Sequence, residues 1–93
     1  MQFRRELRDR VRSGEITCSV RAWQQPHVKV GGMYSLPPGH IEVTSVMEMS
    51  MSDITPEMAR RSGFNGVVDL LKTAVHGPGR RVFLVEFEYL PPD

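Results

Sequence analysis

Apolar side chains near the start of the chain recur at every fourth position. Phe3, Leu7 and Val11 follow this spacing, which places them on one face of a helix. Gly14 can adopt the left-handed conformation that ends many helices, so we expect the helix to stop there. The next residues, 16–20, are small or β-branched and favour a strand. The sequence therefore predicts a helix that leads directly into a strand.

Proline and glycine divide the middle of the chain. The double glycine at 31–32 follows a polar stretch, so residues 22–30 are predicted to form a loop before a short strand over residues 33–36. The Pro-Pro-Gly run at 37–39 then predicts a turn that closes this strand.

Apolar residues occupy every second position through most of residues 41–51, which is the pattern of a strand with one buried face. Val46 breaks this alternation near Ser45. A β-bulge adds one residue to a strand and shifts the phase of every residue after it. We therefore expect one long strand with a bend or bulge near Ser45.

Two short helices are expected after this strand. Thr55 followed by Pro56 is typical of a helix N-cap and a first helical residue, and Gly63 is expected to end that helix. Asn65 is expected to cap a second helix, which ends at residues 76–79.

The final apolar segment, residues 82–90, is predicted to be a long strand that is buried on both faces at first and half exposed later. The predicted strands surround a helical insertion without regular alternation of strand and helix, which indicates an α+β fold. Because 93 residues fill one small domain, we expect a single domain, residues 1–93, in which a small β-barrel with flanking helices removes the exposed edges of the sheet.

Charge is unevenly distributed along the chain, although the net charge is only +1. Residues 1–32 contain six Arg and one Lys against three acidic residues, a net charge of +4, whereas residues 33–93 have a net charge of −3. A basic end can attract a polyanion such as nucleic acid.

Several kinds of site are not expected. Cys18 is the only cysteine, so no intramolecular disulfide or cysteine-based metal cluster can form, and a reducing compartment fits best. His27, His40 and His76 fall in different loops without ligand spacing, so we expect no metal site and no cofactor. The charged N-terminus and the lack of a run of about 18 apolar residues favour a cytoplasmic protein without a membrane segment.

A group of polar residues lies on the first predicted strand. Because side chains alternate along a strand, Thr17, Ser19 and Arg21 share one face, with Ser19 and Arg21 about 7 Å apart. A guanidinium with its fork of donors suits a phosphate, and the hydroxyl groups can support it. The alternative is that Arg21 forms an ion pair with Glu86 or Glu88 on the last strand.

Trp23 and Lys29 fall in the stretch that follows, which is rich in hydrogen-bonding groups and nearly free of acids. Stacking on a flat ring beside cations is a common way to hold single-stranded nucleic acid. A single tryptophan can also cap the mouth of a barrel, so this structural alternative stays open.

A stripe of arginines follows the first predicted helix. Arg4, Arg8 and Arg12 recur every four residues, and like charges so placed cost roughly a few tenths of a kcal/mol per pair. Such a stripe can serve a phosphate backbone, or it can be the solvated face of the helix. If it serves RNA, we expect it to be exposed on the same side of the molecule as Arg21.

Several short segments, taken in order, resemble the ASCH family. They are residues 14–21 with the pattern Gly-Glu-Ile-Thr-Cys-Ser-Val-Arg, the loop 30–32, residues 53–57, the pair Gly63-Phe64 and the final 85–87. The resemblance covers nearly the whole chain. It implies a PUA-like barrel with a cleft beside the first strand, and roles such as RNA binding, RNA cleavage or removal of the acetyl group from N4-acetylcytidine.

The catalytic residues of similar amidohydrolases are only partly matched. In those proteins a Lys and a Thr of the first strand act with a Glu near the helical insertion. Ser19 stands at the Thr position, but Ile16 and Ser62 stand at the Lys and Glu positions, so no catalytic residue is predicted. We therefore expect an RNA- or nucleotide-binding domain. The alternatives are a hydrolase with another base, such as His27, and a protein-interaction domain that uses the methionine-rich strand.

Overall fold

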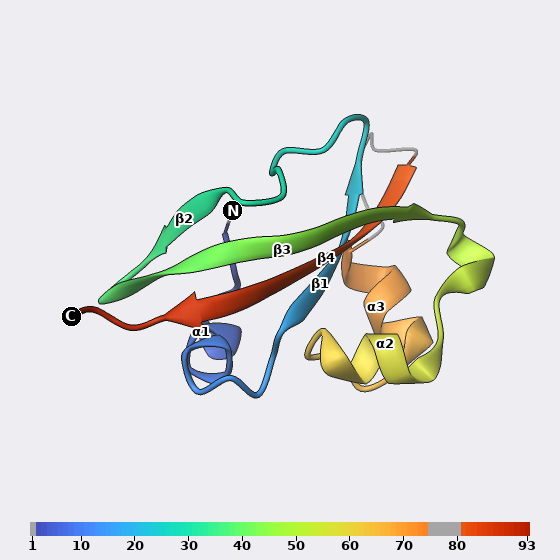
Figure 1. Cartoon of the computed structure of the whole chain (residues 1–93). Coiled ribbons are helices and arrows are strands. Elements are labelled where there is room, and N and C mark those ends of the chain that lie inside the picture. The colour runs from blue at the N-terminus through green and yellow to red at the C-terminus, as the bar shows by residue number, and fades with distance from the viewer. Residues whose placement is uncertain (1, 75–80) are drawn as a thin grey trace.

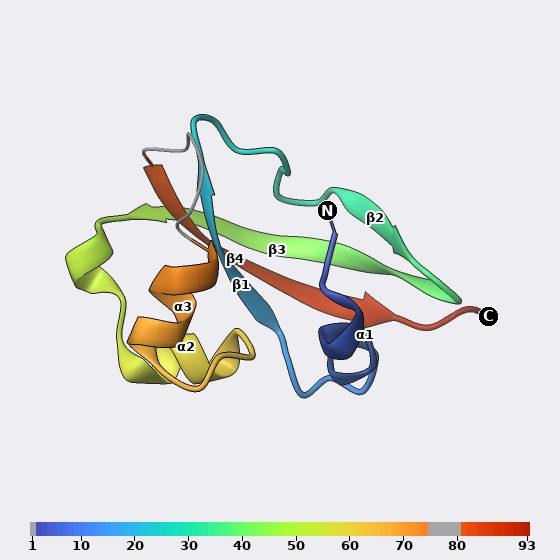
Figure 2. The same ribbon diagram turned by 180° about the vertical axis from the view of Figure 1, so that it is seen from behind.

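The computed structural model describes residues 2–74 and 81–93, and its centre is one antiparallel sheet (Figure 1). The four strands are β1 (Cys18–Trp23), β2 (Met33–Leu36), β3 (Gly39–Met49) and β4 (Arg81–Leu90), in the order β1-β4-β3-β2. The sheet curls into a half-barrel with β1 and β2 at its edges (Figures 1 and 2). The α+β class is therefore confirmed, whereas the two edge strands, as far as the structure describes them, do not pair with each other to close a barrel.

β4 lies inside the sheet and is apolar on both faces. Phe83, Val85 and Phe87 are buried in one hydrophobic cluster, whereas Val82 and Leu84 are buried in another. Since side chains alternate along a strand, these two clusters lie on opposite faces of the sheet. The prediction that the last strand is first buried on both faces and later half exposed is confirmed.

The first cluster is covered by α1 (Arg5–Arg12) and the residues just before it. Phe3, Leu7 and Val11 are all buried there, as their four-residue spacing predicts. The ring of Phe3 meets the ring of Phe87 edge-on, with centroids 5.3 Å apart. Gly14 has a φ of +83°, so it ends the helical segment in the left-handed conformation that was expected.

The second cluster is covered by α2 (Pro56–Arg61) and α3 (Val67–Ala74), which follow the short 3-10 helix η1 (Met51–Asp53). Ala59 of α2 and Leu70 of α3 are buried with Cys18 and Val20 of β1. In both views α2 and α3 lie together and apart from α1 (Figures 1 and 2). The predicted end of the second helix, residues 76–79, lies outside the described residues.

The two expected helix caps have different outcomes. The Thr55 hydroxyl accepts a hydrogen bond from the backbone N–H of Met58 at 3.2 Å, so the predicted N-cap of α2 is confirmed. α3 begins at Val67, two residues after the expected cap at Asn65. Asn65 contributes its backbone N–H, which donates to the carboxylate of Asp69 at 3.0 Å.

The long strand β3 contains the expected irregularity. Its pairing with β4 shifts between Val43 and Ser45, which leaves one extra residue on the β3 side. Ile41 and Val43 belong to the first cluster before the shift, and Val46 packs against the same cluster after it. The bulge therefore explains why Val46 breaks the alternation of the sequence.

β1 differs from its predicted position. The sequence placed the strand over residues 16–20, but β1 continues through Trp23 because Ala22 and Trp23 pair with Val82 and Arg81 of β4. Pairing with a neighbouring strand thus extends β1 beyond the reach of local propensity. As a result Trp23 stands on a strand of the sheet, where a loop was expected, whereas Arg21 lies on the strand as predicted.

Candidate functional site

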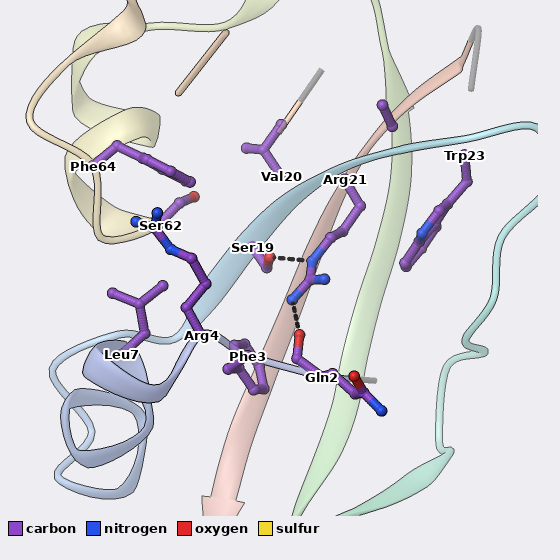
Figure 3. Close-up of a pocket in the computed structure, with 11 residues that line it drawn as sticks. Gln2, Phe3, Arg4, Leu7, Ser19, Val20, Arg21, Trp23, Ser62 and Phe64 are labelled. Carbon is purple, nitrogen blue, oxygen red and sulfur yellow. Dashed lines mark hydrogen bonds between the residues drawn. The ribbon is translucent and has the colours of Figure 1, made fainter. Parts of the chain in front are cut away.

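A pocket of about 340 Å³ opens beside β1, between the start of α1 and the turn that joins α2 to α3 (Figure 3). Its polar lining consists of Gln2, Arg4, Ser19, Arg21 and Ser62, and its apolar lining of Phe3, Leu7, Val20, Ala22, Trp23 and Phe64. Three segments that are distant in sequence therefore meet at one concave surface.

Arg21 is held in this pocket by hydrogen bonds from two of its nitrogens. Its Nε donates to Ser19 Oγ at 2.7 Å, and its Nη2 donates to the backbone carbonyl of Gln2 at 2.6 Å (Figure 3). The guanidinium carbon lies 5.4 Å from the centre of the Phe3 ring. Burial lowers the pKa of the Arg21 guanidinium from its ordinary value, but a guanidinium still keeps its charge at neutral pH.

Arg4 supplies a second positive charge from the opposite side of the pocket. Its side chain runs toward Ser62 and Phe64, whereas Arg21 and Trp23 lie on the other side of Ser19 (Figure 3). The Arg4 guanidinium carbon is 5.7 Å from the centre of the Phe64 ring. Each arginine is thus held against an aromatic ring, which fixes its stem and leaves most of its N–H donors for other partners.

The pocket carries positive charge without a built-in counter-charge. None of the described residues that line it is Asp, Glu, Lys or His. Among the described residues, the alternative ion pair of Arg21 with Glu86 or Glu88 is not formed: Glu86 lies 3.6 Å from Arg61, and Glu88 is in no ion pair. A cation that is partly removed from water and not neutralised nearby attracts an anion more strongly than one that is fully solvated.

Trp23 borders the pocket, but one face of its ring is already occupied. The ring stacks on His27 with centroids 4.7 Å apart and an interplanar angle of 23°. It also lies 6.0 Å from the ring of Phe83 in the first cluster. Trp23 is half buried, so it closes the rim of the core and presents only part of its surface to a ligand.

The hydroxyl of Ser19 has no base beside it among the described lining residues. Its oxygen accepts a hydrogen bond from Arg21, and a guanidinium has no lone pair with which to take up the hydroxyl proton. Ile16, which the resemblance aligns with a Lys, is buried in the first cluster. Ser62, which the resemblance aligns with a Glu, lies with its Oγ 3.6 Å from the sulfur of Cys18. The geometry therefore favours binding over acyl transfer.

The structure brings only some of the predicted site residues together. Arg4, Ser19, Arg21 and Trp23 line the pocket. Thr17 does not share it, because it lies before β1 and lines a separate hollow.

The remaining predicted residues lie outside this pocket. Lys29 is exposed in the loop before β2, where its backbone N–H donates to the Tyr34 hydroxyl at 3.1 Å. Arg8 and Arg12 line a neighbouring hollow. On the methionine-rich strand, Met47 is 52% exposed, and nothing in the structure indicates what would cover it.

Most of the other lining residues, Gln2 and Phe64 among them, were not predicted from the sequence as site residues. Gln2 takes part through its backbone carbonyl, which carries no signal of residue type. Phe64 follows Gly63, and only the fold brings this turn next to α1. The four-residue spacing of Phe3 predicted that it points inward, which is correct, but gave no sign that its ring also supports Arg21.

Cys18 is fully buried next to Ser62, one of the lining residues. Burial raises the pKa of its thiol, so the thiolate needed for nucleophilic chemistry is disfavoured. In the part of the chain that the structure describes, no three His, Cys, Asp or Glu residues gather as a metal ion would require. Within the same residues, no helix has the length and apolar character needed to span a membrane.

The chain was compared with protein families, with curated proteins and with solved structures. None of the three comparisons finds a match. The assignment of a function therefore depends on the geometry and chemistry of the pocket.

Proposed function

We propose that this chain is an RNA- or nucleotide-binding domain of the ASCH type, built on a PUA-like barrel, with Arg21 as its phosphate anchor. One observation carries the proposal: Arg21 is a partly buried guanidinium in a pocket whose described lining has no acidic residue. Ser19 holds its Nε, which orients the fork before a ligand arrives. An oriented fork of donors suits the oxygens of a phosphate group.

The apolar lining supports a ligand that is more than a phosphate. The rings of Phe64 and Trp23, which are both partly exposed, border the pocket beside the two arginines. Bases stack on aromatic side chains and on guanidinium planes whatever their sequence, whereas phosphates interact with the cations. A nucleotide offers both chemistries in one molecule, which is why we prefer it to a simple anion.

The test is a binding measurement with short single-stranded RNA. Replacing Arg21 by Ala is expected to weaken binding by about 1.5–3 kcal/mol, the usual contribution of a charge-assisted hydrogen bond. The slope of log affinity against log salt is expected to fall by about 0.7. Arg21→Lys should recover only part of the loss, because an ammonium keeps the charge but not the planar fork.

A matched control separates a specific contact from a change in net charge. Arg60 is exposed on α2 and is not among the lining residues, so Arg60→Ala removes the same charge away from the pocket. Thermal melting of each variant checks that the fold is intact. If Arg21→Ala and Arg60→Ala have the same affinity and the same salt slope, the pocket is not the binding site and the proposal is wrong.

A further inference from the structure

A second basic hollow lies next to the Arg21 pocket. Its volume is about 460 Å³, and Arg8, Arg12, Ser35 and Pro37 are among its lining residues. The two hollows share Gln2 and Phe3. The segment before α1 is therefore a common wall, with Arg21 on one side and the arginines of α1 on the other.

The arginines of the second hollow are held in place through their Nε atoms. Arg8 Nε donates to the backbone carbonyl of Phe3 at 3.2 Å, and Arg12 Nε donates to that of Pro37 at 2.7 Å. These bonds tie α1 to the segment before it and to the turn between β2 and β3. Each bond uses one of the five N–H donors of its guanidinium, so most donors stay available for a ligand.

The two arginines differ in how far their charge is neutralised. Arg12 Nη1 lies 2.8 Å from the carboxylate of Asp9, so part of its charge is compensated. Among the described residues, Arg8 is in no ion pair, and no acidic residue lines the hollow. Arg8 is therefore the stronger candidate for a phosphate contact.

We propose that this hollow is a second phosphate subsite, so that the ligand is a single-stranded oligonucleotide running from Arg21 across the exposed Gln2 to Arg8. This inference rests on the proposed function and makes it more specific, because a mononucleotide cannot occupy both hollows through one phosphate. A single strand can bend over the ridge between two recesses and place successive phosphates in them. A rigid duplex bends over such a ridge less easily than a single strand does.

The first experiment compares ligands of different length. The probes are uridine monophosphate and an oligouridine of about eight nucleotides, a length that one small nucleic-acid-binding fold can cover. We expect Arg8→Ala to weaken the binding of oligouridine about tenfold and to lower the slope of its log affinity against log salt by about 0.7. The affinity for uridine monophosphate should not change. Arg21→Ala should weaken the binding of both probes.

The matched control is Arg5→Ala, which removes the same charge from the same helix. Arg5 is exposed and lines neither hollow, so its loss should change oligouridine binding by less than about twofold. If Arg8→Ala melts at a lower temperature because the hydrogen bond from Arg8 to the Phe3 carbonyl is lost, Arg8→Gln replaces it in the comparison. Glutamine removes the charge and keeps an amide N–H donor, although on a shorter side chain.

The outcomes distinguish this inference from the proposed function. Equal effects of Arg8→Ala and Arg5→Ala, or an oligouridine that binds no better than uridine monophosphate, would overturn the second subsite while leaving the Arg21 pocket in place. A loss of uridine monophosphate binding in Arg8→Ala would also overturn it. If Arg21→Ala changes neither probe, the proposed function itself fails. A hairpin duplex that binds as tightly as the single strand would refute the single-stranded ligand.

Discussion

Gly63 shows how the absence of one side chain lets distant segments meet. Its φ is +92°, a conformation that residues with a Cβ adopt only at a cost. A Cβ at this position would lie 2.8 Å from a methyl carbon of Leu7 and 2.9 Å from one of Ile16. Both neighbours are buried in the first cluster, so they have little freedom to move aside.

We expect Gly63→Ala to lower the free energy of unfolding by about 2–4 kcal/mol, combining left-handed strain with crowding in the core. Gly14 provides a matched comparison because its φ is also positive, +83°, but a Cβ added there would have no atom within 4 Å. Gly14→Ala should therefore cost only about 1–2 kcal/mol. Urea unfolding of the two variants measures the difference. Equal losses would show that Leu7 and Ile16 yield without cost.

For individual residues, the sequence predicted part of the pocket. The two-residue period of a strand predicted that Ser19 and Arg21 share a face, and they do form a hydrogen bond. It could not reveal that the Gln2 carbonyl would be the other partner of Arg21. It also gave no reason to exclude Glu86 as the partner of Arg21. Such contacts depend on how separate segments fold together, and residue type alone does not specify them.

Among the elements, α2 is the one that depends most on its cap. It has only six residues, and a helix so short is not stable by itself in water. Thr55 satisfies one of its free backbone N–H groups, that of Met58, and Ala59 anchors it in the second cluster. The cap and this contact together hold the helix beside β1.

Thr55→Ala is therefore expected to lower the free energy of unfolding by about 1 kcal/mol, because the N–H of Met58 loses its acceptor. Thr55→Ser keeps the hydroxyl and should stay within about 0.5 kcal/mol of the unchanged protein. Both values can be obtained by chemical denaturation under one set of conditions. A serine variant as unstable as the alanine variant would mean that the methyl group matters and the cap does not.

The elements themselves were largely predictable, and the exceptions have a common cause. The apolar stripe ending at Gly14 and the phase break at Val46 are local signals, and both gave the correct helix and bulge. The end of β1 was missed because Ala22 and Trp23 become a strand through pairing with β4. That partner lies roughly 60 residues further along the chain, beyond the reach of any local pattern.

At the scale of the whole molecule, the sheet depends on β4. This strand pairs with β1 on one side and with β3 on the other, and it contributes to both hydrophobic clusters. Without it β1 has no partner in the sheet. No part of the fold that lacks β4 is therefore expected to be stable by itself.

We expect a chain that ends at residue 80 to show no cooperative thermal transition, because both clusters lose their central residues. Adding a synthetic peptide of residues 81–93 should restore the transition if it pairs in the native register. The control is a chain that lacks only residues 92–93, which are exposed, and it should melt like the full chain. A cooperative transition in the chain that ends at residue 80 would disprove the central role of β4.

The order of the strands along the chain also affects how the protein can fold while it is being synthesised. β2 and β3 are consecutive and can form their hairpin early, but β1 must wait until β4 leaves the ribosome. At about 5–20 residues per second, the residues between Trp23 and Arg81 take roughly 3–12 s to add. During that interval β1 exposes an unpaired edge and the apolar side chain of Val20, features that other nascent chains and chaperones recognise.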